Sequence, residues 1–307
     1  MWITAGSSSE VPPSLSSMDS RTRETGRRLL ENYYVRQQGL VAFIDESTRG
    51  RERYEEFPFY ILSAVIYRVE NLKELRAELV DSASGTFWHT TESYKNRDYS
   101  GIRKMSEAVA NGWSSGLVAI QVDIPDGNLE LARRESLIQL SSLLLDFDCK
   151  LAIYEKRNTR ALDAGDASLL NLARRDGWLR KGLALVGSRP AIEPLLWSPD
   201  LLCWGFRQVL TRGDSSWLRP FSEGLKVLDV SKMLSRNEKR PETAAARNSG
   251  PVLPADQIGD RASRSSSQIM PHYQMQMQDI YHMLPKLVGP RFPPDELRSW
   301  LRKIFPI

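Results

Sequence analysis

The sequence has little of the chemistry that marks secreted, membrane-spanning or cysteine-ligated proteins. Only two of its 307 residues are cysteines, Cys149 and Cys203, and both lie in apolar stretches, which argues against a disulfide framework or a cysteine-based zinc site. No run of 18 apolar residues is present, so we expect no membrane anchor. The first residues lack the basic region and apolar core of a secretory signal. These features together predict a cytoplasmic protein.

The chain also has few histidines and a small net charge. The chain has three histidines, and His89 is the only one in its first 270 residues. The formal net charge of +4 and the pI of about 9.0 permit a polyanionic partner but do not by themselves establish nucleic-acid binding. The 41% hydrophobic content over this length is sufficient for a substantial core.

Composition divides the chain into one predicted domain and three flanking segments. Residues 1–20 are rich in Ser and Pro, which predicts a disordered N-terminal tail. Residues 234–270 combine charged, Ala-rich and Ser-Arg sequence and are interpreted as a flexible loop or linker. Residues 271–307 are again apolar and aromatic, which predicts a helical arm that packs on the domain, on a second copy of the chain or on a protein partner. The folded domain is therefore expected over residues 21–233.

Within this domain the hydrophobic periodicity alternates between strand and helix. The expected strands are 40–44, 57–67, 117–124, 149–154 and 183–187; the expected helices are 21–37, 71–80, 99–111, 129–147, 167–178 and one beginning near residue 200. This order predicts an α/β fold with a mixed sheet of about five strands flanked by helices. Its first three strands would be antiparallel, the later ones would be joined by helical crossovers, and a helical insertion would occupy about 70–112.

The first strand is the most informative stretch. Five apolar residues, 40–44, end on the adjacent carboxylates Asp45 and Glu46. Because successive strand side chains point to opposite faces, only one of the two acids can face a given site, and we expect it to be Asp45. The alternative is a solvated strand end that enters a polar loop.

Two further acids occupy comparable positions. Glu155 follows the fourth expected strand, and Asp200 lies at the start of the last helix. Clustered carboxylates of this kind can hold two Mg²⁺ ions, roughly 3.5 to 4 Å apart, for phosphodiester hydrolysis. The alternative for Asp200 is a helix-capping role, which does not exclude metal binding.

Three short motifs resemble the bacterial family known as domain of unknown function 3800. They are Ile44-Asp45-Glu46-Ser47, Trp88-His89 and Ser198-Pro199-Asp200-Leu201-Leu202, and the resemblance covers roughly residues 39–212. It implies a ribonuclease H-like fold and a nuclease that depends on Mg²⁺ or Mn²⁺. In that pattern Asp45, Glu155 and Asp200 are the metal ligands, and Glu135 is the candidate for a further acid. The chain departs from the family at Thr48 and Arg49, where the family usually has Gly after the serine, and at Glu155, where Asp is more frequent.

Other candidates surround these acids, each with a simpler alternative. Glu46 or Glu135 would support the site, and His89 would assist proton transfer or orient substrate, unless it is a hydrogen-bonded structural histidine. Four basic residues would contact nucleic acid, or else form an ordinary solvated face: Arg133, Arg134, Lys156 and Arg157. The alternative to a nuclease is a ribonuclease H-like module that binds nucleic acid or a protein without cutting, as one subunit of a larger system.

Overall fold

The fold is built on one mixed β-sheet. The computed structural model describes residues 20–50, 58–85, 87–122, 124, 127–156, 160–176 and 181–230. The strands are β1 (Leu40–Arg49), β2 (Phe59–Arg68), β3 (Ser115–Val122), β4 (Leu151–Glu155), β5 (Ala184–Ser188) and β6 (Leu225–Asp229). They lie in the order β5-β4-β1-β2-β3-β6.

The strand directions follow the predicted pattern. β1 and β2 pair antiparallel, as do β2 and β3, whereas β4 is parallel to β1 and β5 is parallel to β4. The predicted α/β fold class with a mixed sheet flanked by helices is thereby confirmed, with six strands in place of about five. The additional strand β6 pairs parallel to β3 at the far edge. Its five residues are too short to show a strand periodicity without that neighbour.

β1 is longer than predicted. It was expected to end at residue 44 but continues to Arg49, because it pairs with β2 along its whole length, from Leu40 opposite Arg68 to Arg49 opposite Phe59. The alternative of a solvated strand end that enters a polar loop after Asp45 and Glu46 is therefore wrong. Both acids lie within the strand, where their side chains are fixed on opposite faces of the sheet.

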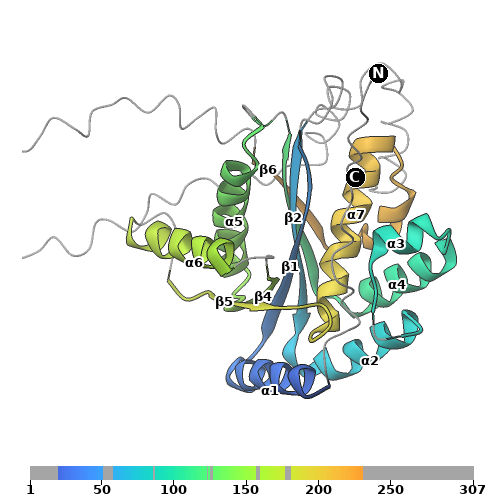
Figure 1. Cartoon of the computed structure of the whole chain (residues 1–307), viewed down its shortest axis with the longest axis horizontal. Coiled ribbons are helices and arrows are strands. Elements are labelled where there is room, and N and C mark those ends of the chain that lie inside the picture. Colours follow the sequence, from blue (N-terminus) through green and yellow to red (C-terminus); the bar gives the residue numbers. More distant parts are fainter. Residues whose placement is uncertain are drawn as a thin grey trace, which may run out of the picture.

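Helices cover both faces of the sheet (Figure 1). One face carries α7 (Trp197–Arg212), with α2 (Leu72–Ser82) and α4 (Tyr99–Gly112) beyond it; the other carries α5 (Leu129–Asp146) and α6 (Arg160–Arg175). Since the parallel strands are joined by helical crossovers, each face is covered and the sheet is buried on both sides. No helix in the described part of the chain is long and apolar enough to cross a membrane.

The remaining described helices are short or lie at the end of the sheet. α1 (Ser20–Arg36) buries Leu30 and Tyr34. α3 (Thr90–Lys95) was not predicted and lies with α2 and α4 between β2 and β3, within the expected insertion. Three 3₁₀ helices complete the description: η2 (Val69–Asn71), η4 (Pro194–Leu196) and η5 (Ser216–Phe221). The predicted linker 234–270, the arm 271–307 and the tail 1–20, except Ser20, lie outside the described residues.

The sheet separates two hydrophobic clusters. One contains Phe43 of β1 and Ile153 of β4 together with Leu201 of α7. The other contains Ile44 and the buried side of α5, such as Leu140. Alternate residues of β1 thus face α7 and α5 in turn, and this alternation decides where the acids point.

Candidate active site

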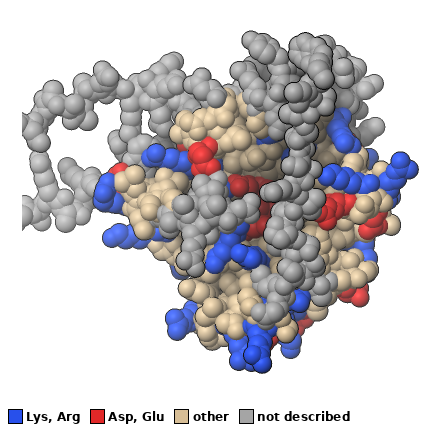
Figure 2. Space-filling view, viewed as in Figure 1, with Lys and Arg blue, Asp and Glu red and all other residues tan. Residues whose placement is uncertain are grey.

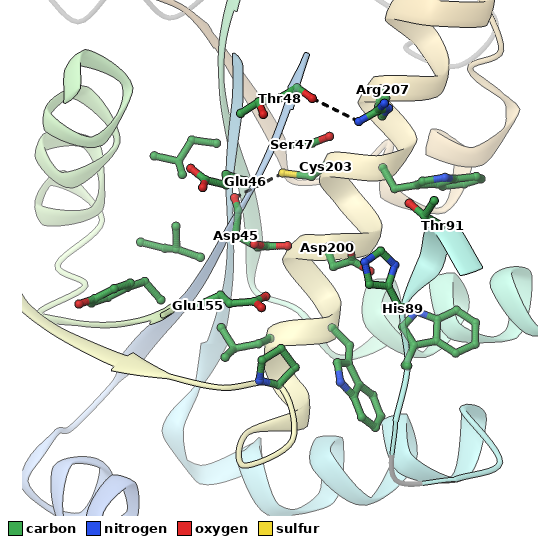
Figure 3. Close-up of a pocket in the computed structure, with 18 of the residues that line it drawn as sticks. Asp45, Glu46, Ser47, Thr48, His89, Thr91, Glu155, Asp200, Cys203 and Arg207 are labelled. Carbon is green, nitrogen blue, oxygen red and sulfur yellow. Dashed lines mark hydrogen bonds between the residues drawn. The ribbon is translucent and has the colours of Figure 1, made fainter. Parts of the chain in front are cut away.

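Three carboxylates from distant parts of the chain converge on the α7 face of the sheet. Asp45 lies two residues after Phe43 in β1, and Glu155 lies two residues after Ile153 in β4. Both acids therefore point to the same face of the sheet as Phe43 and Ile153, which is the face that packs on α7. β1 and β4 are adjacent and in register, since Ile44 lies opposite Tyr154. Asp200 is in the first turns of α7 and lines the same pocket as the other two acids, with its side chain beside His89 (Figure 3).

These acids line one pocket of about 550 Å³. The predicted site residues that line it are Asp45, Glu46, His89, Arg133, Glu155, Lys156 and Asp200. In the space-filling view, acidic side chains lie near the middle of the displayed face, with basic side chains on several sides of them (Figure 2). The pocket therefore combines clustered carboxylates with nearby basic side chains.

Two of the three acids, Asp45 and Glu155, have raised pKa values. Burial raises the pKa of Asp45 well above its usual range, the charges of Glu155 and Asp200 raise it further, and Arg133 partly opposes them. Burial and the charge of Asp200 raise the pKa of Glu155 to about 7. Near neutral pH the cluster therefore disfavours carrying all its negative charge, and a proton or a bound cation would relieve this repulsion.

Asp200 is held by residues that follow the predicted histidine. The backbone N–H and the Oγ1 hydroxyl of Thr90 donate to Oδ2 of Asp200, at 3.0 and 2.7 Å. Nε1 of Trp88 donates to Oγ1 of Thr90 at 3.1 Å, and Thr90 is fully buried. Asp200 is not the N-cap of α7, which is Leu196. Sequence reasoning missed Thr90 because the contact spans 110 residues and leaves no local pattern.

Glu46 points away from Asp45, toward α5. It accepts hydrogen bonds from the Tyr60 hydroxyl and from Nη1 of Arg133. Arg133, which was expected on an open phosphate-facing surface, is 7% exposed, and its guanidinium also donates to the Tyr60 hydroxyl at 3.1 Å. That expected placement is corrected: the ion pair with Glu46 buries Arg133 beneath the pocket.

The other predicted residues are distributed unevenly. His89 is exposed and lies beside Asp200 at the pocket (Figure 3). Lys156 is also exposed and lines the pocket. Arg134 is exposed and Glu135 is partly buried, and neither lines the pocket, although their neighbour Arg133 on α5 does. Burial raises the pKa of Glu135. Arg157 lies outside the described residues.

α7 contributes two further pocket residues that sequence reasoning missed. Cys203 and Arg207 lie three and seven positions after Asp200, the spacing that places side chains on one helix face. Sγ of Cys203 lies 3.4 Å from the Asp45 carbonyl oxygen, and Nη1 of Arg207 donates to the Thr48 carbonyl at 3.3 Å (Figure 3). The helical spacing from Asp200 is the signal that would have identified Arg207.

The donor atoms are near one another but are not arranged as a finished coordination shell. Among the described residues, no three Asp, Glu, His or Cys side chains are close enough together to hold a metal ion as they stand. The donor set is nevertheless composed of carboxylate oxygens, which hard divalent cations prefer.

No family model and no curated protein matches the chain, so membership of the family that its motifs resemble stays a prediction. Similar solved structures include ribonuclease H2 from Pyrococcus horikoshii OT3, with 14% identity, a TM-score of 0.37 and coverage of 86% of this chain and 96% of that one. Bst-RNase HIII in complex with Mn²⁺ has 12% identity and a TM-score of 0.33, over 56% of this chain and 53% of that one. A mutant of Bst-RNase HIII has 13% identity and a TM-score of 0.35, over 59% and 57%. The fold assignment rests on the strand order and directions described above.

Proposed function

We propose that this protein is a divalent-metal-dependent nuclease that hydrolyses phosphodiester bonds of nucleic acid. The observation that carries the proposal is the convergence of Asp45, Glu155 and Asp200, from β1, β4 and α7, in one pocket where their charges repel one another. A site that concentrates negative charge in this way favours a cation. Its raised pKa values are also typical of sites that perform chemistry.

Mg²⁺ or Mn²⁺ fits this donor set, and Asp45, Glu155 and Asp200 are the residues that would hold it. When bound, such an ion lowers the pKa of a water molecule and stabilises the charge that develops on a phosphate. Glu135 lies away from the pocket, so the proposal does not depend on it.

The chain's own residues would supply orientation and charge. Thr90 fixes one oxygen of Asp200, which leaves the other available to the pocket. Glu46 lies on the opposite face of β1 and keeps Arg133 close enough to moderate the charge of Asp45. Lys156 and Arg207 would contact phosphates of the substrate.

His89 would move a proton or orient the substrate. Its side chain is exposed and lies beside Asp200 at the pocket, within the space where a phosphate would sit (Figure 3). An imidazole can donate or accept a proton near neutral pH, which suits the departure of an alkoxide. This assignment follows from position and side-chain chemistry.

Cleavage of labelled nucleic acids tests the proposal. The panel comprises single- and double-stranded DNA, RNA and an RNA–DNA hybrid, each incubated with Mg²⁺, Mn²⁺ or EDTA. We expect metal-dependent cleavage by the wild type and a loss of at least about 100-fold for Asp45→Asn, because the substitution removes one anionic ligand. The matched control is Asp81→Asn, since Asp81 is exposed on α2 and does not line the pocket. Equal activity of Asp45→Asn and the wild type would refute the assignment.

One observation favours a second candidate, a module of the same fold that binds nucleic acid or a protein without cutting. The described carboxylates are not preassembled around a cation position. Calorimetric titration with Mn²⁺ separates the two functions. A nuclease site should bind Mn²⁺ with an affinity that Asp45→Asn weakens, whereas a binding module should show no Mn²⁺ site that depends on Asp45.

A further inference from the structure

In the segment before α3, exposed and buried side chains alternate. Phe87 is 37% exposed, Trp88 is 6% exposed and His89 is exposed. All three line the pocket that holds the carboxylates. His89 has an extended backbone, with φ −148° and ψ 115°, and in an extended segment residues i and i+2 share one side. Phe87 and His89 therefore lie together on the open side.

The buried member of this segment anchors it next to Asp200. Trp88 packs in the α7-side core and donates to Thr90, whose hydroxyl and backbone N–H both donate to Asp200. These hydrogen bonds tie the segment to the first turns of α7. Phe87, the residue before Trp88, is thus held at the carboxylate pocket with part of its side chain exposed.

Phe87 is an exposed aromatic side chain. It is not among the buried and partly buried residues of either hydrophobic cluster, and no aromatic ring of the described residues stacks on it. An isolated exposed aromatic is unremarkable on an open surface. Phe87, however, shares one pocket with acids that would carry a cation and with Lys156 and Arg207, which can contact phosphates. A planar apolar ring can stack on the base of a nucleotide, and the neighbouring basic side chains can contact its phosphate.

We propose that Phe87 is a stacking platform for an unpaired nucleobase of the nucleotide next to the scissile phosphate. The inference rests on the proposed function and narrows its substrate to single-stranded or locally unpaired nucleic acid. Every base has a π-face, so a phenyl ring accepts any base without reading its identity. Bases inside a duplex are already stacked on both faces and are not available to Phe87. The pocket would therefore distinguish single-stranded from double-stranded nucleic acid but would not distinguish base sequences.

Fluorescence anisotropy in EDTA measures binding without metal-dependent cleavage. The probes are a labelled 12-nucleotide single strand of mixed sequence and the blunt duplex of the same sequence. Phe87→Ala should weaken single-strand binding about tenfold, as expected for the loss of one stacked base, and should change duplex binding less than about twofold. Phe87→Tyr retains an aromatic face and should bind the single strand within about twofold of the wild type.

Tyr33→Ala is the matched control, because Tyr33 is 44% exposed on α1 and does not line the pocket. It should leave both affinities unchanged. Thermal unfolding of each variant checks that the fold is intact. Single-strand affinity of Phe87→Ala equal to that of the wild type, or an equal loss for both probes, would overturn the stacking role. Failure of the wild type to bind either probe would overturn it as well.

The cleavage assay separates this inference from the proposed function. Phe87-dependent single-strand binding without metal-dependent cleavage would refute the nuclease and retain the stacking platform. Metal-dependent cleavage by the wild type, together with a single-strand affinity that Phe87→Ala does not change, would retain the nuclease and refute the stacking platform. If both hold, Phe87→Ala should raise KM about tenfold and change kcat little, because stacking acts equally on the bound substrate and on its transition state.

Discussion

Opposing electrostatic effects act on the ionisation of Asp45. Burial and the charges of Glu155 and Asp200 disfavour its anionic form, whereas Arg133 favours it. The same repulsion disfavours an anionic Glu155, whose pKa is raised to about 7. In the absence of a cation, the arrangement that brings the acids together costs stability at neutral pH. Such a cost is expected of a site selected for binding or chemistry.

The stability of the protein should therefore depend on pH through Glu155. Its folded-state pKa lies above the usual value of 4.5, so between pH 4.5 and 7 the folded protein keeps a proton that the unfolded chain has lost. The free energy of unfolding thus falls as pH rises through this window. Glu155→Gln cannot titrate, and in EDTA its stability relative to the wild type should increase by on the order of 2 kcal/mol from pH 5 to pH 8.

Urea unfolding of the wild type and of Glu155→Gln at several pH values checks this expectation. Each is monitored under the same salt concentration, since screening changes the repulsion between the acids. Parallel pH profiles of the two proteins would show that Glu155 titrates in the folded protein as it does in the unfolded chain.

Thr90 should act on the site through Asp200. Thr90→Val removes the hydroxyl that joins Trp88 to Asp200 while keeping the backbone N–H contact and the side-chain shape. We expect Mn²⁺ affinity to fall about tenfold, because residues that orient metal ligands typically have effects of that size. A destabilisation of about 1 to 3 kcal/mol should accompany it, since the Trp88 N–H loses its partner.

Thr90→Ser is the matched control, because it keeps a hydroxyl at the same position. Calorimetry should give it an Mn²⁺ affinity near that of the wild type, even if the lost methyl group lowers its stability. A loss of affinity equal to that of Thr90→Val would mean that packing, and not the hydrogen bond, positions Asp200.

At the scale of the element, the start of α7 is fixed by a buried ion pair. Glu193 is fully buried and precedes η4, which leads into α7. Its carboxylate accepts two hydrogen bonds from Arg76 of α2, both at 2.9 Å, and one from the Tyr34 hydroxyl of α1 at 2.8 Å. One side chain thereby links α1, α2 and the segment that carries Asp200.

Removing this carboxylate should destabilise the fold strongly. Glu193→Ala leaves the Arg76 guanidinium, which is only 15% exposed, without its counter-ion, and we expect a loss of about 3 to 5 kcal/mol in the free energy of unfolding. Tyr34→Phe removes one hydrogen bond to a charged group and should cost about 1.5 to 3 kcal/mol.

Glu24→Gln provides the comparison. Its i,i+4 ion pair with Arg28 lies on the exposed surface of the same helix α1, so its loss should change stability by less than about 0.5 kcal/mol. Urea unfolding measures all three variants. If Glu193→Ala were no more harmful than Glu24→Gln, the ion pair would not be what secures the start of α7.

At the scale of the whole molecule, the described residues contain both hydrophobic clusters and the complete six-stranded sheet. Each face of that sheet is already covered by helices within residues 20–230 (Figure 1). We propose that this region is the folding unit and that residues 271–307 serve association with a second copy or another protein.

Ending the chain after residue 233 tests that division. The shortened protein should unfold cooperatively within a few degrees of the full chain, because every described residue of both clusters is kept. Light scattering should show it as a monomer, and the full chain as a larger species if the arm mediates self-association. A shortened protein that fails to fold would place part of the core in the removed residues.

Local sequence information was sufficient for most elements and for the identity of the acids. Periodicities of 2 and 3.6 residues arise from the backbone geometry of neighbouring residues, which is why the bounds of β2, α4 and α5 were predicted within about two residues. Asp45, Glu155 and Asp200 could likewise be selected because each follows an apolar run expected to be a strand or lies at the start of an expected helix. Their side-chain chemistry was determined by the sequence.

Only the tertiary structure decided how these elements act on one another. The extension of β1 to Arg49 depends on β2, and the existence of β6 depends on β3, because a strand is stabilised by its neighbour. The burial of Arg133 against Glu46, 87 positions away, and the hold of Thr90 on Asp200, 110 positions away, leave no local periodicity. The sequence determined which groups the chain carries, whereas the packing of α7 and α5 on opposite faces of one sheet determined which of them meet.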